Sequence, residues 1–102
     1  MIEKFIEIFK GLNVAYGKFV PEGKNELGKV KGEANTIRCQ GGIPEELWEE
    51  HLNGTKSLGI IPIDENNQCR WGCIDIDSYN GFDHLEWITK IRKHGLHLIV
   101  CI

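Results

Sequence analysis

The pattern of hydrophobic and polar positions predicts three helices. The first ends before Gly11, the second opens at Pro44 and closes at Gly54, and the third spans about residues 82–94, where Asn80 is expected to cap it. In each, apolar residues recur three or four positions apart, which is typical of an amphipathic helix. The apolar faces comprise Ile2, Phe5, Ile6 and Phe9 in the first helix, Leu47, Trp48, His51 and Leu52 in the second, and Leu85, Ile88 and Ile91 in the third.

Three apolar stretches predict strands in the second half of the chain. Residues 57–63 and 70–76 flank the polar segment 64–68, which indicates a β-hairpin with a turn of about five residues. Residues 96–102 follow the third helix and form a further apolar run. Strand, helix and strand in this order imply a right-handed crossover, with the last strand parallel to residues 70–76.

The region between the first two helices is rich in glycine. Residues 11–42 hold seven of the twelve glycines with poor periodicity, so loops are expected there, with one or two short strands such as 14–20. Residues 1–54 are thus a helical and glycine-rich N-terminal part, and residues 55–102 begin a sheet. The whole chain is expected to be one α+β domain, or the N-terminal part of one. No turn or polar residue follows the last apolar run, so we expect the natural protein to continue.

Composition indicates a globular protein. The 102 residues are 41% hydrophobic and 26% charged, which excludes a disordered tail, a collagen-like rod and a coiled coil. No apolar run approaches the roughly 20 residues of a membrane span, and no targeting segment is visible. The cysteine spacing differs from that of a zinc site, so we expect reduced thiols in a cytoplasmic protein, with metal ligation as the alternative. The four cysteines are Cys39, Cys69, Cys73 and Cys101.

Charge is distributed unevenly along the chain. The formal net charge is −3, and between residues 43 and 86 ten acidic residues accompany only Lys56 and Arg70. A protein that binds nucleic acid through its bulk charge is usually more basic than this. A solvated acidic face accounts for most of these acids. Asp75 and Asp77 are the exceptions.

The two aspartates form the strongest local motif, Asp-x-Asp at the end of a predicted strand. Side chains alternate along a strand, so Asp75 and Asp77 would share one face while Ile74 and Ile76 face the third helix. Two neighbouring carboxylates repel each other unless a cation lies between them, and oxygen ligands suit magnesium or manganese. Alternatively, the aspartates face water or cap the next helix.

The segments around this motif resemble a known family, and they extend over roughly the second half of the chain. They are His51-Leu52-Asn53-Gly54, Ser57-Leu58-Gly59-Ile60-Ile61-Pro62-Ile63, Cys69-Arg70-Trp71-Gly72-Cys73-Ile74-Asp75-Ile76-Asp77-Ser78-Tyr79 and Leu96-His97-Leu98-Ile99-Val100-Cys101. Together they resemble the primase-polymerases of the archaeo-eukaryotic primase superfamily. Within it, they are most similar to the branch found in phages, plasmids and the TOTE conflict systems.

This resemblance implies a fold and a reaction. The family's catalytic core is an RRM-like sheet, and its first motif is an Asp-x-Asp that binds divalent metals. Asp75 and Asp77 would accordingly be catalytic ligands of Mg²⁺ or Mn²⁺. The partners would be a DNA template and nucleoside triphosphates, which the enzyme joins in a metal-dependent nucleotidyl transfer used in DNA replication.

Two further motifs of the family are missing from these 102 residues. A Ser-x-His motif that holds the nucleotide's phosphates normally follows the strand matching residues 96–101, and a third motif supplies another carboxylate. His94 and His97 do not fit, because neither has a serine two residues before it. We therefore expect no polymerase activity from residues 1–102 alone.

Other candidates have weaker signals. Lys56 could contact phosphate or template, although a solvated lysine is the commoner case, and Arg70 is expected to be a surface charge. His51 is expected to be a hydrogen-bonded structural residue on its helix. Trp71 could stack on a base, but cover by the N-terminal segment is favoured. The basic residues of the glycine-rich region could follow a nucleic-acid backbone or lie on a mobile loop; they are Lys24, Lys29, Lys31 and Arg38.

Two rival functions remain open on the sequence. One is a nucleic-acid-binding or regulatory module without catalysis. The other is a protein-interaction module, in which the exposed edge of the strand at residues 96–102 pairs with a partner or a second copy.

Overall fold

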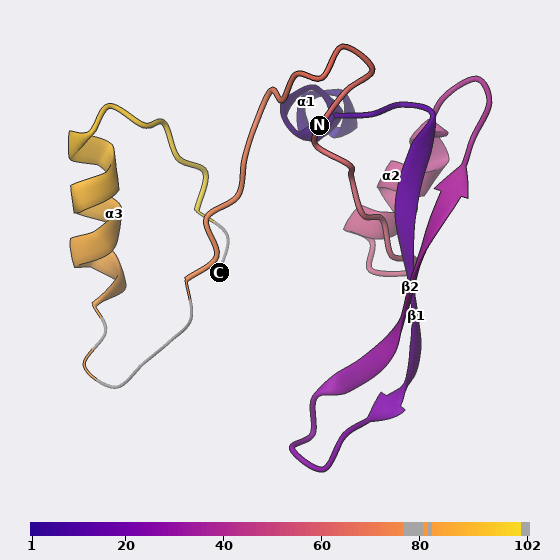
Figure 1. Ribbon diagram of the computed structural model, residues 1–102, viewed down its shortest axis with the longest axis horizontal. Coiled ribbons are helices and arrows are strands. Elements are labelled where there is room, and N and C mark those ends of the chain that lie inside the picture. The colour runs from indigo at the N-terminus through magenta and orange to yellow at the C-terminus, as the bar shows by residue number, and fades with distance from the viewer. Residues whose placement is uncertain (77–80, 82, 101–102) are drawn as a thin grey trace.

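The computed structural model describes residues 1–76, 81 and 83–100. Its elements follow the order α1 (Ile2–Phe9), β1 (Ala15–Lys24), β2 (Val30–Arg38), α2 (Glu45–Leu52) and α3 (His84–Lys93). The described residues therefore form three helices and one two-stranded antiparallel sheet, which confirms the predicted α+β class. Figure 1 shows α1, α2 and the β1–β2 hairpin together, with α3 apart from them.

An aromatic chain joins α1 to its neighbours. The Phe5 ring packs against Phe9, with centroids 4.8 Å apart, and meets Trp48 of α2 edge-on at 5.9 Å. Phe9 in turn meets Trp71 edge-on at 5.8 Å. Edge-to-face pairs at these separations are favourable. The buried hydrophobic residues of the described chain are Trp48, which belongs to this cluster, and Ala15 at the start of β1.

Helices α1 and α2 confirm two of the predicted helices and their boundaries. α1 ends at Phe9, and Lys10 turns into extended backbone before Gly11. α2 begins directly after Pro44, which is itself extended, and ends at Leu52. Gly54 follows with a φ of 75°, a left-handed conformation that glycine adopts without the steric cost of a side chain.

We expected the glycine-rich region to be mainly loop, but it forms a long hairpin. β1 and β2 pair in antiparallel register from Ala15–Arg38 to Lys24–Val30, with an irregularity beside Pro21. Glycine and proline within both strands, and polar residues on both faces, concealed the period of two in the sequence. Gly32 makes room for Phe19, whose Cζ lies 2.7 Å from the position a Cβ would take.

The hairpin turn is organised by Asn25. Its side-chain oxygen accepts from the backbone N–H of Leu27 and of Lys29, at 3.0 and 2.9 Å. Gly28 completes the turn with a φ of 76°. An asparagine that mimics a backbone turn in this way is a common turn device.

The hairpin predicted for residues 57–76 is confirmed in its turn, but its two strands are wrong. Residues 64–68 do form a turn, in which the Asp64 carboxylate accepts from two backbone N–H groups, but the arms share only an isolated bridge between Ile63 and Cys69. Each arm instead makes a hydrogen bond to another part of the chain, the first through its backbone and the second through the Trp71 indole. Ile61 accepts from the N–H of Leu12, whereas Trp71 bonds to the end of α1.

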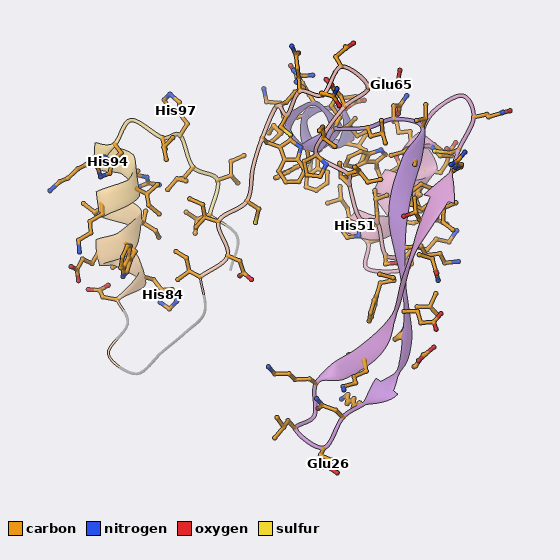
Figure 2. The ribbon with its side chains drawn as sticks, in the orientation of Figure 1. Glu26, His51, Glu65, His84, His94 and His97 are labelled. Atoms are coloured by element: carbon orange, nitrogen blue, oxygen red, sulfur yellow. The ribbon has the colours of Figure 1, made fainter. Side chains whose placement is uncertain are left out.

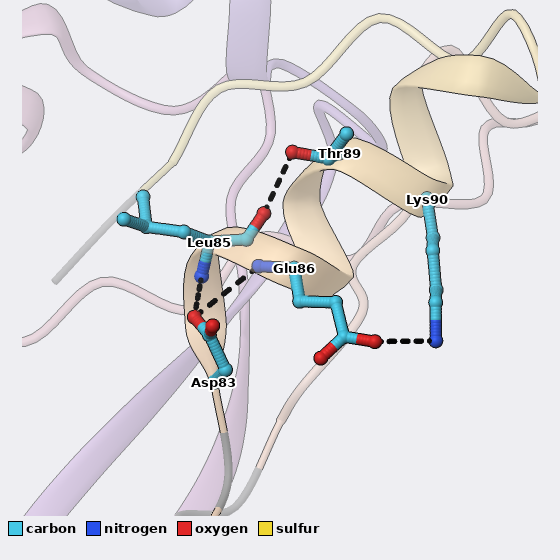
Figure 3. A network of polar contacts seen from close by, with 5 residues as sticks. All are labelled: Asp83, Leu85, Glu86, Thr89 and Lys90. Atoms are coloured by element: carbon cyan, nitrogen blue, oxygen red, sulfur yellow. Dashed lines mark hydrogen bonds and ion pairs between the residues drawn. The ribbon is translucent and has the colours of Figure 1, made fainter.

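α3 begins two residues later than predicted. Asp83 caps it by accepting from the N–H of Leu85 and of Glu86, and the Glu86–Lys90 ion pair spans one turn at 2.9 Å (Figure 3). The expected cap, Asn80, lies outside the described residues. Capping and an i,i+4 pair stabilise the helix locally.

The predicted burial of α3 and the strand after it are not found. No helix or strand of the described chain packs against α3, and Leu85 is 75% exposed. Residues 96–100 form no strand, and residues 101–102 lie outside the described part. Because an isolated apolar run gains no ladder hydrogen bonds, it needs a neighbouring strand to become one. The predicted β-α-β crossover is therefore absent from residues 1–76, 81 and 83–100.

The chain is less compact than its length predicts. Its radius of gyration is 16.2 Å, against about 13 Å for a compact domain of this size. In Figure 1, α3 lies apart from α1 and α2, and the β1–β2 hairpin extends away from these helices. No helix in the described residues is long and apolar enough to span a membrane.

Candidate functional site

Asp75 lies in the extended segment that follows Trp71. Its side chain is exposed and makes no hydrogen bond or ion pair with any residue that the structure describes. Asp77 lies outside the described residues, so the pairing of the two carboxylates stays a prediction. Residues 71–76 are not a strand in the described chain, and the expected sheet behind the motif is therefore not found there.

The chemistry of Asp75 nevertheless suits a divalent cation. A carboxylate is the oxygen ligand that magnesium and manganese prefer. Among the described residues, which include Asp75 but not Asp77, no three His, Cys, Asp or Glu side chains gather closely enough to hold a metal. Asp75 is therefore an exposed oxygen donor, and two further such side chains do not gather around it among the described residues.

Trp71 holds the start of this segment against α1. Its indole Nε1–H donates to the carbonyl oxygens of Phe9 and Lys10, at 2.9 and 3.2 Å. This confirms the favoured prediction that the N-terminal segment covers Trp71. These two hydrogen bonds of the indole hold the chain at Trp71, four residues before Asp75.

Lys56 lies in the loop after α2 and pairs with Glu50. Its Nζ is 2.8 Å from a Glu50 carboxylate oxygen. The hydrogen bond to Glu50, together with the charge of that carboxylate, raises the pKa of Lys56 above 10.5. Lys56 is 58% exposed, as expected of a solvated lysine, and its ammonium stays charged at neutral pH.

Two further hydrogen bonds hold the loop that carries Lys56. The His51 Nδ1–H donates to the carbonyl oxygen of Lys56 at 3.2 Å, and the Thr55 hydroxyl donates to that of Glu50 at 2.9 Å. The expectation of a hydrogen-bonded His51 is thus confirmed. His51 is exposed beside α2 (Figure 2).

A groove separates this loop and α2 from β1. Its volume is about 670 Å³. The residues that matter for its chemistry are Tyr16, Lys18, Val20, Leu47, His51 and Lys56. Asp75 does not line it, so the structure does not bring Lys56 and Asp75 together in one site.

Backbone contacts fix one wall of the groove. Gly17 and Gly59 exchange two N–H···O hydrogen bonds of 2.7 Å each, which requires the two backbones to approach closely. Two residues further along β1, the Ser57 hydroxyl accepts from the N–H of Phe19 at 2.9 Å and donates to the carbonyl oxygen of Phe19 at 3.0 Å. Residues 57–59 therefore attach the loop after α2 to the edge of β1.

The remaining sequence candidates lie on the surface. Arg70 is exposed, as expected. The bases of the glycine-rich region are exposed on the hairpin, where Lys24, Lys31 and Arg38 lie on strands and Lys29 closes the turn. The described cysteines, Cys39, Cys69 and Cys73, are free thiols, and Cys101 lies outside the described residues.

Sequence reasoning missed the β1 side of the groove. Tyr16 and Lys18 were not singled out, because the strand was expected only as a short element in a loop region. A usable signal was present: the alternation of Tyr16, Lys18 and Val20 places these three residues on one face of a strand. Their proximity to Lys56, some forty residues later, depends on the Gly17–Gly59 contact.

Searches among protein-family models, curated proteins and solved structures found no match to this chain.

Proposed function

We propose that this chain is the N-terminal part of a DNA primase-polymerase with an RRM-like core, in which Asp75 and Asp77 bind Mg²⁺ or Mn²⁺. The observation that carries the proposal is the Asp-x-Asp motif within a segment that resembles the family. When bound, the metal would supply charge neutralisation for the triphosphate of the incoming nucleotide. The chain's own contribution is the pair of carboxylates and the segment that presents them.

The surroundings of Asp75 support this assignment. A structural aspartate often accepts hydrogen bonds from backbone N–H groups, as Asp64 does in its turn and Asp83 does at the start of α3. Asp75, by contrast, is exposed and has no such partner among the described residues. Trp71, four residues earlier, ties the start of the segment to α1.

Metal binding by the 102-residue chain tests the proposal. Mn²⁺ broadens the NMR signals of nuclei near it, so a titration should broaden amide signals in a region centred on Asp75. Competition by Mg²⁺ should restore these signals. Asp75→Asn and Asp77→Asn should each abolish the local broadening, because each removes a charged ligand.

Glu65→Gln is the matched control. It removes an exposed acidic side chain from the turn at residues 64–68, outside the motif. The broadening around Asp75 should persist in this variant. Broadening that is spread over the acidic residues of α2, or that is unchanged by Asp75→Asn, would rule out the assigned ligands.

Nucleotidyl transfer itself is expected to need the two missing motifs. Primer extension with Mn²⁺, a primed DNA template and deoxynucleotides should therefore stay at background for residues 1–102. Extension above background would show that these residues contain a complete active site, contrary to the proposal.

A second candidate is nucleic-acid binding without catalysis, which the lysine-lined groove favours. In this case DNA binding by the chain would be unchanged by Asp75→Ala and by EDTA, and the Mn²⁺ titration would give no local broadening.

A further inference from the structure

We infer that the groove between β1 and α2 binds a single-stranded nucleic acid. Lysines would contact the phosphates, and Tyr16 would stack on an unpaired base. This inference concerns a site apart from Asp75 and stands on the groove's own chemistry, whether or not the chain takes part in catalysis.

The charge of the groove is opposite to that of the chain. Of the described residues that line it, two are lysines, Lys18 and Lys56, and none is an aspartate or a glutamate. The chain as a whole has a net charge of −3. A local excess of cations on an acidic protein favours a polyanion at that place.

The pairing of Lys56 with Glu50 leaves Lys56 able to bind phosphate. An ammonium group carries three N–H donors, and the Glu50 carboxylate accepts one of them at 2.8 Å. The remaining donors belong to a side chain that is 58% exposed. Lys18, on the opposite wall, is exposed as well. Glu50 thus positions Lys56, while Lys18 and Lys56 approach the groove from both sides.

The rest of the lining suits flat, apolar bases. Tyr16 and Val20 share one face of β1 with Lys18, and Leu47 lies across from them on α2. Alternation of cationic and aromatic side chains is the usual way in which proteins hold unpaired nucleotides. The groove's volume of about 670 Å³ lies within the range of small-ligand clefts, so it fits one or two unpaired nucleotides rather than a duplex.

Fluorescence anisotropy of a labelled oligothymidylate of about 16 nucleotides tests the inference. The titration uses the 102-residue chain in EDTA, so that metal binding plays no part. With two phosphate contacts, the logarithm of the association constant should fall with the logarithm of salt concentration at a slope of about −1.4.

Two variants locate the binding. Lys18→Gln should make the slope shallower by about 0.7, because one phosphate contact is lost. Tyr16→Leu keeps an apolar side chain at this position but removes the ring, and should weaken binding by about fivefold or more. Lys31→Gln is the matched control, because it removes the same charge from the same hairpin outside the groove. It should leave both slope and affinity unchanged.

Several outcomes would overturn the inference. They are the absence of binding, equal effects of Lys18→Gln and Lys31→Gln, and displacement of the oligonucleotide by polyglutamate of equal charge. The last result would identify the groove as a site for acidic peptides. Circular dichroism of each variant confirms that the hairpin and helices remain.

Failure of this inference and failure of the metal proposal are separable. If Asp75→Asn abolishes local Mn²⁺ broadening but leaves oligothymidylate binding intact, both are supported. If the wild-type chain shows no local Mn²⁺ broadening around Asp75 but still binds oligothymidylate, the catalytic proposal alone is removed. If Mn²⁺ broadens the signals around Asp75 but the chain does not bind oligothymidylate, the groove assignment alone is removed.

Discussion

The indole nitrogen of Trp71 donates to the carbonyl oxygen of Phe9 at 2.9 Å, across 62 positions of the chain. Carbonyl groups at the end of a helix lack partners within it, and Trp71 supplies one at the end of α1. The same side chain packs edge-on against the Phe9 ring. This contact links the N-terminal helix to the segment that carries Asp75.

Trp71→Phe should lower the free energy of unfolding by about 1 kcal/mol, because it keeps a smaller aromatic ring and removes the hydrogen-bond donor. Trp71→Ala should cost about 2 kcal/mol or more, because packing against Phe9 is lost as well. Urea unfolding followed by circular dichroism measures both. Equal stability of wild type and Trp71→Phe would show that the hydrogen bond contributes nothing measurable.

Gly11→Ala should destabilise the protein by about 1–3 kcal/mol through overpacking. A Cβ at this position would overlap the carbonyl oxygen of Ile61 and lie 3.1 Å from the Cα of Pro62. Gly72→Ala is the control, because no described atom lies within 4 Å of its added Cβ. It should change stability by no more than about 0.5 kcal/mol. Thermal or urea unfolding of the pair checks the contrast.

Glu50→Gln should return the pKa of Lys56 toward its ordinary value of 10.5, because the carboxylate is the main cause of the raised pKa. While Glu50 is ionised, the stabilisation from the pair is fully present below pH 10.5, and it is lost as pH rises through the raised pKa of Lys56 in the folded state. An NMR titration of the Lys56 side chain measures the shift. Glu49→Gln, on the neighbouring position of α2, should leave the Lys56 titration unchanged.

Asp83→Ala should reduce the helicity of α3, at a cost of about 1 kcal/mol, because two N–H groups of the first turn lose their acceptor (Figure 3). Asp83→Asn keeps an acceptor oxygen and should retain most of the helix. Backbone chemical shifts of residues 84–93 report this directly. Unchanged shifts in Asp83→Ala would mean that the cap is not needed for α3.

The helices were predictable from sequence because their determinants are local. The spacing of Phe5 and Phe9, and the position of Pro44 before α2, depend only on neighbouring residues. The turn at residues 64–68 is local in the same sense, since Asp64 bonds within it. The Asp75 and Asp77 motif is likewise legible in the chain, although the geometry of the pair stays a prediction.

The strands and the groove were decided by tertiary contacts. A strand needs a partner, and residues 57–63 and 70–76 did not form the expected ladder with each other. The backbone of Gly59 and Ile61 bonds instead to Gly17 and Leu12, while the Trp71 indole bonds to the end of α1. The β1–β2 hairpin formed in a region whose glycines interrupt the alternation of apolar and polar residues that would predict a strand. The sequence by itself thus determined the helices, the turn and the motif residues. Only the folded chain brought Lys18 opposite Lys56, because the close approach of Gly17 and Gly59 joins segments that are far apart in the sequence.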